Sequence, residues 1–284
     1  MRLCLDSFVP PLARITRGTA AWVRELGFRV IGVDLETPQT IDTARCRQVH
    51  DLLDGEGVST GQVWSVGTPL VRPDPDEMRR NLTSLLDRIP CAAALGCRVL
   101  LVEAGGYHPT NPWFPHGRNH TDEALDVLIA QLRAVAPVAT DHGIVVAPEM
   151  SLMTILCSPT RAREMLDGVG NEAIGINFDP ANITEPRFLY RSGDLIREAF
   201  RLLGHRIVNA HAKEVIAHEV PLVVHLDETY AGNGVLDYPA FLDGLARLAS
   251  WTCLVIEHLT DYGQVAAVKD FLERTAQEVG VTWE

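Results

Sequence analysis

Residues 144–179 read IVVAPEMSLMTILCSPTRAREMLDGVGNEAIGINFD. Two short apolar runs, 144–149 and 173–179, enclose a stretch whose helical part begins near Thr160. A helix between two short apolar runs is typical of neighbouring parallel strands joined by a crossover helix. Each run also ends in a carboxylate, Glu149 in the first and Asp179 in the second. The stretch therefore predicts a β/α unit with an acidic group at the end of each strand.

The same alternation continues in both directions along the chain. Further strand-like runs precede helical stretches at 3–7, 30–36, 58–66, 98–104, 206–211 and 252–257. This rhythm indicates eight parallel strands with helices outside them. An open doubly wound sheet is the alternative, but it more often carries a glycine-rich turn after its first strand. Residues 8–11 read FVPP without glycine, so the sequence favours an α/β fold of one closed (β/α)8 TIM barrel.

The length and composition suit one globular enzyme-sized domain. A (β/α)8 barrel needs roughly 250 residues, and the chain has 284, so we expect residues 1–284 to form a single TIM-barrel domain. Long loops are expected at 105–120 and 212–238, after the fourth and seventh strands. The formal net charge of −12 and the lack of any Lys/Arg run argue against nucleic acid as a partner.

The compartment is predicted from cysteines and from apolar runs. The six cysteines form no CxxC pair, which in a chain of this length indicates a reducing environment. The first six residues are too short and polar for a signal peptide. No apolar run approaches the roughly 20 residues that span a bilayer, so no membrane partner is expected. We expect a cytoplasmic protein, and a homo-oligomer is left open.

Four consecutive strands end in Glu149, Asp179, His211 and Glu257. The carboxyl ends of barrel strands meet at one face, where barrel enzymes place their active sites. A single carboxylate there is often a helix cap or an ion-pair partner, but three together repel one another unless a cation lies among them. Lys213 can neutralise only one of them. One divalent metal ion is therefore expected, with Mn²⁺ placed first and Mg²⁺, Co²⁺ or Zn²⁺ as alternatives.

The residues around these strand ends resemble a known family. The motifs are VAPE at 146–149, NFDPAN at 177–182, HAKE at 211–214, GNGVLDY at 232–238 and VIE at 255–257. They are similar to those of the xylose isomerase-like TIM-barrel superfamily, in its sugar isomerase/epimerase branch. That branch includes ketose 3-epimerases, 2-keto-myo-inositol isomerases and inosose dehydratases. The resemblance covers nearly the whole chain in strand order.

The resemblance implies a ligand set and a pair of proton-transfer groups. One divalent metal would be bound by Glu149, Asp179, His211 and Glu257, and the two glutamates would double as acid and base across the substrate. The chain departs from the family in two places: Glu214 stands where many relatives have Asp, and Asn182 stands where many ketose 3-epimerases have His. The second departure argues against an assignment as a ketose 3-epimerase.

Further residues near the strand ends are assigned to substrate binding. Glu36 ends the second strand, Trp64 lies near the end of the third, and His108 follows the fourth. Lys213 shares a strand face with His211 because side chains alternate with a period of two, and Asn182 follows Asp179. The alternatives are a core aromatic for Trp64, a solvated loop histidine for His108 and a simple ion-pair partner for Lys213.

These residues predict an isomerase or epimerase of a small keto-sugar or keto-cyclitol. Protons would move through an enediolate that the metal stabilises. A dehydratase of an inosose-like substrate on the same metal site is the alternative. An endonuclease-IV-type DNA repair enzyme fits less well, because the extra histidines that it needs are missing from the strand ends of this sequence. A non-catalytic sugar-binding barrel is disfavoured as well, because it would not need the complete ligand set. The polyhydroxylated carbonyl substrate is expected to be unphosphorylated, because the loop after strand seven is acidic and has Lys213 as its only fixed cation.

Overall fold

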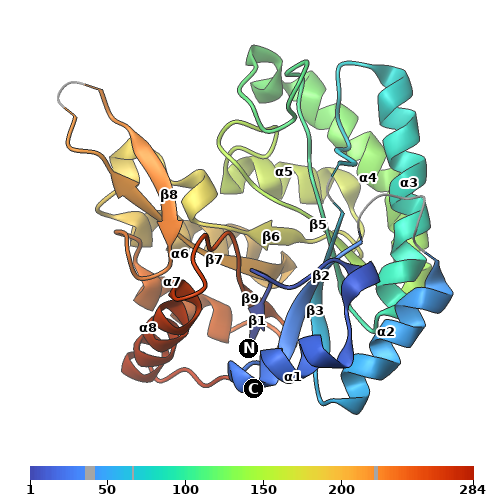
Figure 1. Cartoon of the computed structure of the whole chain (residues 1–284). Helices are drawn as coiled ribbons and strands as arrows, with labels where there is room; N and C mark the ends of the chain where they lie inside the picture. Colours follow the sequence, from blue (N-terminus) through green and yellow to red (C-terminus); the bar gives the residue numbers. More distant parts are fainter. Residues whose placement is uncertain (36–41, 66, 221–222) are drawn as a thin grey trace.

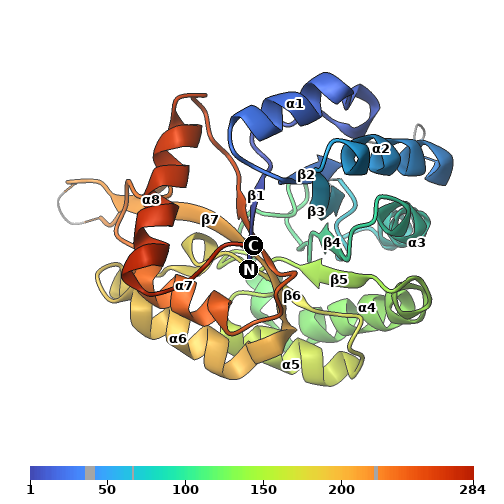
Figure 2. The same cartoon turned by 90° about the horizontal axis from the view of Figure 1, so that it is seen from below.

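The computed structural model describes residues 1–35, 42–65, 67–220 and 223–284. Eight parallel strands form an inner wall, and helices cover it from outside, as seen from the side in Figure 1 and from below in Figure 2. The predicted (β/α)8 barrel is confirmed. The wall strands are β1 (Arg2–Leu5), β2 (Val30–Asp34), β3 (Ser59–Ser65), β4 (Val99–Val102), β5 (Val145–Pro148), β6 (Ile176–Phe178), β7 (Ile207–Ala217) and β9 (Cys253–Ile256).

The wall closes at a seam between β5 and β6. The other neighbours pair in the order β5-β4-β3-β2-β1-β9-β7-β6, all in parallel. Across the seam, the described residues form two isolated parallel bridges, Val146↔Ile174 and Glu149↔Asn177. The backbone N–H of Gly175 donates to the Val146 carbonyl at 2.9 Å. Because all eight strands run the same way, their carboxyl ends share one face of the barrel.

The helices begin and end where local side chains satisfy free backbone groups. They are α1 (Arg17–Glu25), α2 (Thr43–Gly55), α3 (Pro75–Ala94), α4 (Asp122–His142), α5 (Pro159–Val169), α6 (Ser192–Leu203), α7 (Tyr238–Ala246) and α8 (Gln264–Glu278). The Asp74 side chain accepts the N–H of Asp76 at the start of α3, and Ser158 caps α5 in the same way. Gly143 and Gly170 end α4 and α5 with φ of 66° and 67°, a conformation that favours glycine. Among the described residues, no helix has the length and apolar character needed to cross a membrane.

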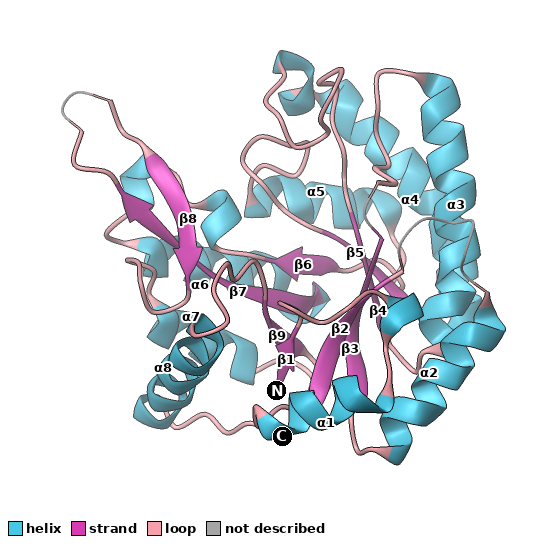
Figure 3. Cartoon of the chain, in the orientation of Figure 1, coloured by secondary structure: helices cyan, strands magenta, loops and turns pink. Residues whose placement is uncertain are grey.

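The prediction of one long loop over 212–238 is wrong. β7 runs on to Ala217 and turns back into β8 (Leu226–Tyr230), which pairs with it antiparallel. The β7–β8 hairpin projects beyond the barrel mouth (Figure 3). Glu228, in the middle of β8, lies at the barrel mouth. The composition of residues 226–230 is polar, which is typical of a loop. Pairing with the extended β7, rather than burial of an apolar face, makes this segment a strand.

The chain ends lie together at the opposite end of the barrel. The N–H of Glu284 donates to the carbonyl of Met1 at 3.0 Å, and Figure 2 shows both termini below the middle of the wall. Between the wall and the helices lies an extensive apolar core, in which Phe178 meets Phe200 and Phe241 edge-on at centroid distances of 5.5 and 5.6 Å. The mouth with the strand ends is therefore free of both termini.

Candidate metal centre

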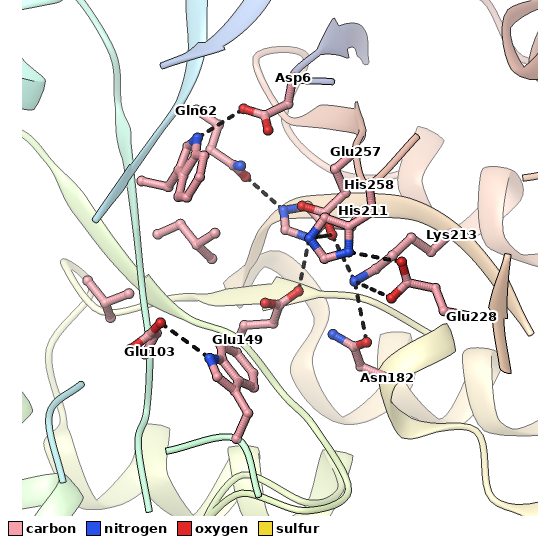
Figure 4. Close-up of a pocket in the computed structure, with 14 residues that line it drawn as sticks. Asp6, Gln62, Glu103, Glu149, Asn182, His211, Lys213, Glu228, Glu257 and His258 are labelled. Carbon is pink, nitrogen blue, oxygen red and sulfur yellow. Dashed lines mark hydrogen bonds and ion pairs between the residues drawn. The ribbon is translucent and has the colours of Figure 1, made fainter. Parts of the chain in front are cut away.

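Four side chains converge at the mouth of the barrel. Each of Glu149, Asp179, His211 and Glu257 offers one ligand atom, and these atoms lie within 4.8 Å of one another. All four side chains are buried, with Asp179 at 0% and the two glutamates at 7% exposure. The cluster borders a cavity of about 340 Å³ (Figure 4). The structure thus brings together the complete ligand set expected from the sequence.

The strand ends explain why these side chains meet. β5, β6 and β9 end at Pro148, Phe178 and Ile256, so each carboxylate is the first residue beyond its strand. His211 sits inside β7, because that strand continues upward into the β7–β8 hairpin. The parallel pairing of these strands then holds the four residues at one level of the barrel.

His211 lies between the two glutamates. Its Nδ1 atom is 2.9 Å from Glu149 Oε1 and 2.8 Å from Glu257 Oε1. On the other side of the ring, Nε2 lies 3.0 Å from the Oε1 atom of Gln62. An amide oxygen only accepts, so Nε2 carries a proton and Nδ1 faces the carboxylates. Burial opposes the charged imidazolium, but Glu257 and Glu149 together raise the pKa of His211 well above its usual value.

Lys213 is buried on the same face of β7. Its Nζ atom is 2.8 Å from Asp179 Oδ2 and 2.8 Å from Glu257 Oε1. Burial disfavours the ammonium, but Asp179 and Glu257 outweigh it and raise the pKa of Lys213. For Asp179, burial outweighs the nearby ammonium and raises its pKa. Burial also opposes ionisation of Glu257, yet His211 and Lys213 lower its pKa.

The charges of this cluster fit a divalent cation. With His211 neutral, as a metal-ligating imidazole is, three carboxylates against the single ammonium of Lys213 leave two negative charges in a buried place. A divalent cation matches that charge, with His211 as a neutral nitrogen ligand beside the oxygen ligands. Glu149, Asp179, His211 and Glu257 are therefore the residues that would hold it.

A layer of amides below the cluster was not predicted from the sequence. Gln62, Asn177 and Asn209 are each at most 1% exposed. The Nδ2 of Asn177 donates to Glu149 Oε1 at 3.1 Å, and Asn209 donates to both Asn177 Oδ1 and Gln62 Oε1. Such contacts fix the orientation of ligand side chains. The available signal was a polar residue inside each apolar strand.

The predicted substrate-binding residues are placed unequally. Trp64, Asn182 and Lys213 line the cavity, and Lys213 Nζ donates to Asn182 Oδ1 at 3.4 Å. His108 does not line it: its Nδ1 accepts the N–H of Asn111 at 3.3 Å, and its ring packs against Phe114. That residue organises its own loop, so the assignment of His108 to the pocket is corrected. Glu36 lies outside the described residues.

Two further residues, Glu228 and His258, complete the rim. Glu228 of β8 lies 2.9 Å from His258 Nδ1 through one oxygen and 3.6 Å from Lys213 Nζ through the other. His258 follows Glu257 with a φ of 57°, which turns its ring toward this rim. Glu228 reaches the cavity only because the β7–β8 hairpin folds back, so no pattern local to 226–230 indicated it.

Comparisons with known proteins agree with this architecture. Residues 20–276 match the family model described as xylose isomerase-like TIM barrel. A search of curated proteins gave no match. Among solved structures, a xylose isomerase-like TIM barrel protein from Mycobacterium smegmatis in complex with magnesium is 17% identical, with a TM-score of 0.74 over 98% of this chain and 97% of that one.

Two further structures share the fold at low identity. A D-psicose 3-epimerase in the presence of D-fructose is 15% identical, with a TM-score of 0.70 over 99% of this chain and 100% of that one. The IOLI protein with a bound zinc atom is 13% identical, with a TM-score of 0.69 over 98% of each chain.

Proposed function

Because this chain belongs to the xylose isomerase-like TIM barrel family, we propose that it is a metal-dependent isomerase or epimerase of a small, unphosphorylated keto-sugar or keto-cyclitol. The observation that carries the proposal is the convergence of Glu149, Asp179, His211 and Glu257 beside a cavity. The fold shared with a D-psicose 3-epimerase, and with structures that hold magnesium or zinc, supports it.

Glu149 and Glu257 are the proposed proton-transfer pair. They end β5 and β9 and approach the His211 ring nitrogen from two directions, at 2.9 and 2.8 Å. One glutamate, ionised at the start, takes a proton from the carbon next to the substrate carbonyl. The other, protonated at the start, donates its proton to a carbon of the resulting enediolate, so the two glutamates exchange protonation states in each turnover. A bound divalent cation would supply the Lewis acidity that makes this C–H bond acidic.

Lys213 is the proposed donor to a substrate oxygen. Its ammonium lines the cavity and is fixed by Asp179, Glu257 and the amide oxygen of Asn182. An ammonium held in place before the reaction stabilises negative charge that develops on a substrate oxygen. Asn182 acts in this scheme by keeping the Lys213 amine at the cavity wall.

The cavity wall favours a neutral substrate. Among the described residues that line it, five carry carboxylates and Lys213 carries the one ammonium, and none is an arginine: Asp6, Glu103, Glu149, Glu228 and Glu257 are the acids. A phosphate group is usually held by arginines, lysines or helix N-terminal N–H groups. Hydroxyl groups, in contrast, donate to carboxylates. This balance supports an unphosphorylated polyol.

The test is exchange of a substrate proton with solvent. The purified protein, loaded with Mn²⁺, is incubated in D₂O with a panel of keto-sugars and inososes, and deuterium uptake is followed by mass spectrometry. We expect uptake at a carbon next to the carbonyl, with Glu25→Gln on the surface of α1 as an unaffected control. Release of a dehydrated product would instead assign a dehydratase. No exchange with any compound, despite bound Mn²⁺, would indicate a sugar-binding barrel without turnover.

A further inference from the structure

Two carboxylates outside the metal cluster line other parts of the same cavity, and each is held by an indole. Asp6 follows β1, and its Oδ1 atom accepts from Trp64 Nε1 at 3.0 Å. Glu103 follows β4, and its Oε1 atom accepts from Trp113 Nε1 at 3.2 Å. Figure 4 shows the two carboxylates at separate ends of the cavity, away from Lys213. Neither belongs to the four-residue cluster.

Glu103 is buried with one oxygen lacking a donor. Its exposure is 8%, and among the described residues Oε2 has no hydrogen-bond partner. Arg72 is near enough to act on Glu103 by its charge, but its guanidinium donates to Glu77 and to the carbonyls of His108 and Pro109. A buried carboxylate oxygen without a donor costs free energy unless a ligand supplies the donor. Because Glu103 lines the cavity, a ligand bound there can supply the missing donor.

Asp6 occupies a space that the neighbouring strand leaves open. A Cβ atom placed on Gly32 of β2 would lie 1.9 Å from Asp6 Oδ1, so any larger residue there would displace the carboxylate. The backbone of Asp6 is fixed by donation from its N–H to the Ile256 carbonyl at 2.9 Å. The glycine and the Trp64 indole together hold this carboxylate against the cavity. Burial, with Glu257 nearby, raises the pKa of Asp6 to about 7, and in either protonation state the carboxyl can accept from a hydroxyl.

We propose that Asp6 and Glu103 form a hydroxyl-binding subsite. This subsite selects a neutral substrate that carries hydroxyl groups on both sides of its carbonyl group. This inference rests on the proposed function for its substrate class. Each carboxyl accepts a hydrogen bond from one substrate hydroxyl, while Trp64 and Trp113 hold the carboxyls in place. A site built to bind a hydroxyl discriminates strongly against an analogue that lacks it, because the buried acceptor is then left unpaired.

The first test measures binding without turnover. Isothermal titration with myo-inositol and with xylitol is compared between the Mn²⁺-loaded wild type, Asp6→Asn, Glu103→Gln and the surface control Glu25→Gln. We expect the wild type and the control to bind at least one polyol alike. At a pH of about 8.5, where a group with a pKa of about 7 is ionised, each carboxamide variant should bind about 10-fold more weakly, because a neutral amide oxygen replaces a charged acceptor. Binding of neither polyol to the wild type, or equal binding by all four proteins, would overturn the subsite.

Two further measurements separate a local effect from misfolding and from failure of the proposed function. Mn²⁺ affinity should be unchanged in both variants, because neither residue is a proposed ligand. Should a carboxamide variant misfold, Trp113→Phe, which leaves Glu103 without its orienting donor, should weaken polyol binding several-fold. If the variants bind polyol more weakly than the wild type, but no keto-sugar exchanges a proton with solvent, only the enzymatic proposal is overturned. If a keto-sugar exchanges its proton normally, but the variants and the wild type bind polyols and their deoxy analogues with equal affinity, only the subsite is overturned.

Discussion

The two halves of the barrel mouth differ in how their charges are balanced. On the half formed by β5, β6, β7 and β9, the carboxylates face one another around His211 and Lys213, and their oxygens lie 2.8 to 2.9 Å from the nitrogen atoms of these two residues. On the half formed by β1 to β4, Asp6 and Glu103 stand apart, and each meets an indole N–H. We call these the metal half and the selectivity half. Our proposals therefore assign cation binding to the metal half and hydroxyl binding to the selectivity half.

Removing the proposed bases of the metal half should have the largest effect on turnover. Glu149→Gln and Glu257→Gln keep an oxygen toward the centre but remove the group that takes the proton. We expect kcat to fall about 10³-fold in each, within the usual range for a general acid or base, with Mn²⁺ still bound. Asp6→Asn should instead act mainly on KM. Near wild-type turnover by both glutamine variants would show that other residues transfer the protons.

Removing the nitrogen ligand of the metal half should lower the affinity for Mn²⁺, whereas a change in the selectivity half should leave this affinity unchanged. The wild type should bind one Mn²⁺ per chain, and His211→Ala should lower the affinity at least about 100-fold. Gln62→Leu, which removes the acceptor at His211 Nε2, should lower it about 10-fold. Trp64→Phe in the selectivity half is the matched control and should bind normally. Titration followed by electron paramagnetic resonance measures all four. Far less than one equivalent in the wild type, or full binding by His211→Ala, would contradict the assignment.

The selectivity half should discriminate against a phosphorylated substrate. For matched free and phosphorylated keto-sugars, we expect kcat/KM to favour the free compound about 10-fold or more, because a dianion meets unpaired carboxylates. Glu103→Gln should narrow that ratio, since it removes one negative charge without adding a cation. Steady-state kinetics on both compounds give the comparison. A preference for the phosphorylated compound would reveal an anion site formed by backbone amides.

The smallest expected effect concerns pH. The pKa of Asp6 is raised from 3.8 to about 7, so between these values the folded chain binds a proton that the unfolded chain has lost. The contribution of Asp6 to stability therefore falls as pH rises from about 4 to about 7. Asp6→Asn should make this decline shallower. Urea unfolding of wild type and variant at several pH values measures the difference, and parallel profiles would show that Asp6 does not titrate in this range.

Much of the metal half could be predicted because strand ends are local signals. A short apolar run followed by Glu149 or Asp179 fixes the place of the carboxylate once the barrel is assumed. The selectivity half gave weaker signals. Asp6 also ends an apolar run, but a single acid there is as easily a helix cap, and Glu103 was masked by the loop that follows it. What distinguishes both is the indole partner, which lies 58 residues away for Asp6 and 10 for Glu103.

The β7–β8 hairpin shows a second limit of prediction. Residues 226–230 are strongly polar, so their strand character depends on β7 alongside them and not on their own composition. Glu228 therefore escaped notice although it lines the cavity. The prediction that His108 lines the pocket was wrong for a different reason: a histidine near a strand end can instead form hydrogen bonds within its own loop.

The seam between β5 and β6 has a consequence for how the barrel opens. Its two isolated bridges place Glu149 and Asn177 side by side, two residues from Asp179. A cation held by Glu149 and Asp179 would therefore join two strands that are tied only by isolated bridges among the described residues. In hydrogen exchange, local opening of the seam would become linked to release of the ion. The amides of Val146 and Gly175, which bond across the seam, should then exchange more slowly as the Mn²⁺ concentration rises, while those in β2 and β3 stay unchanged.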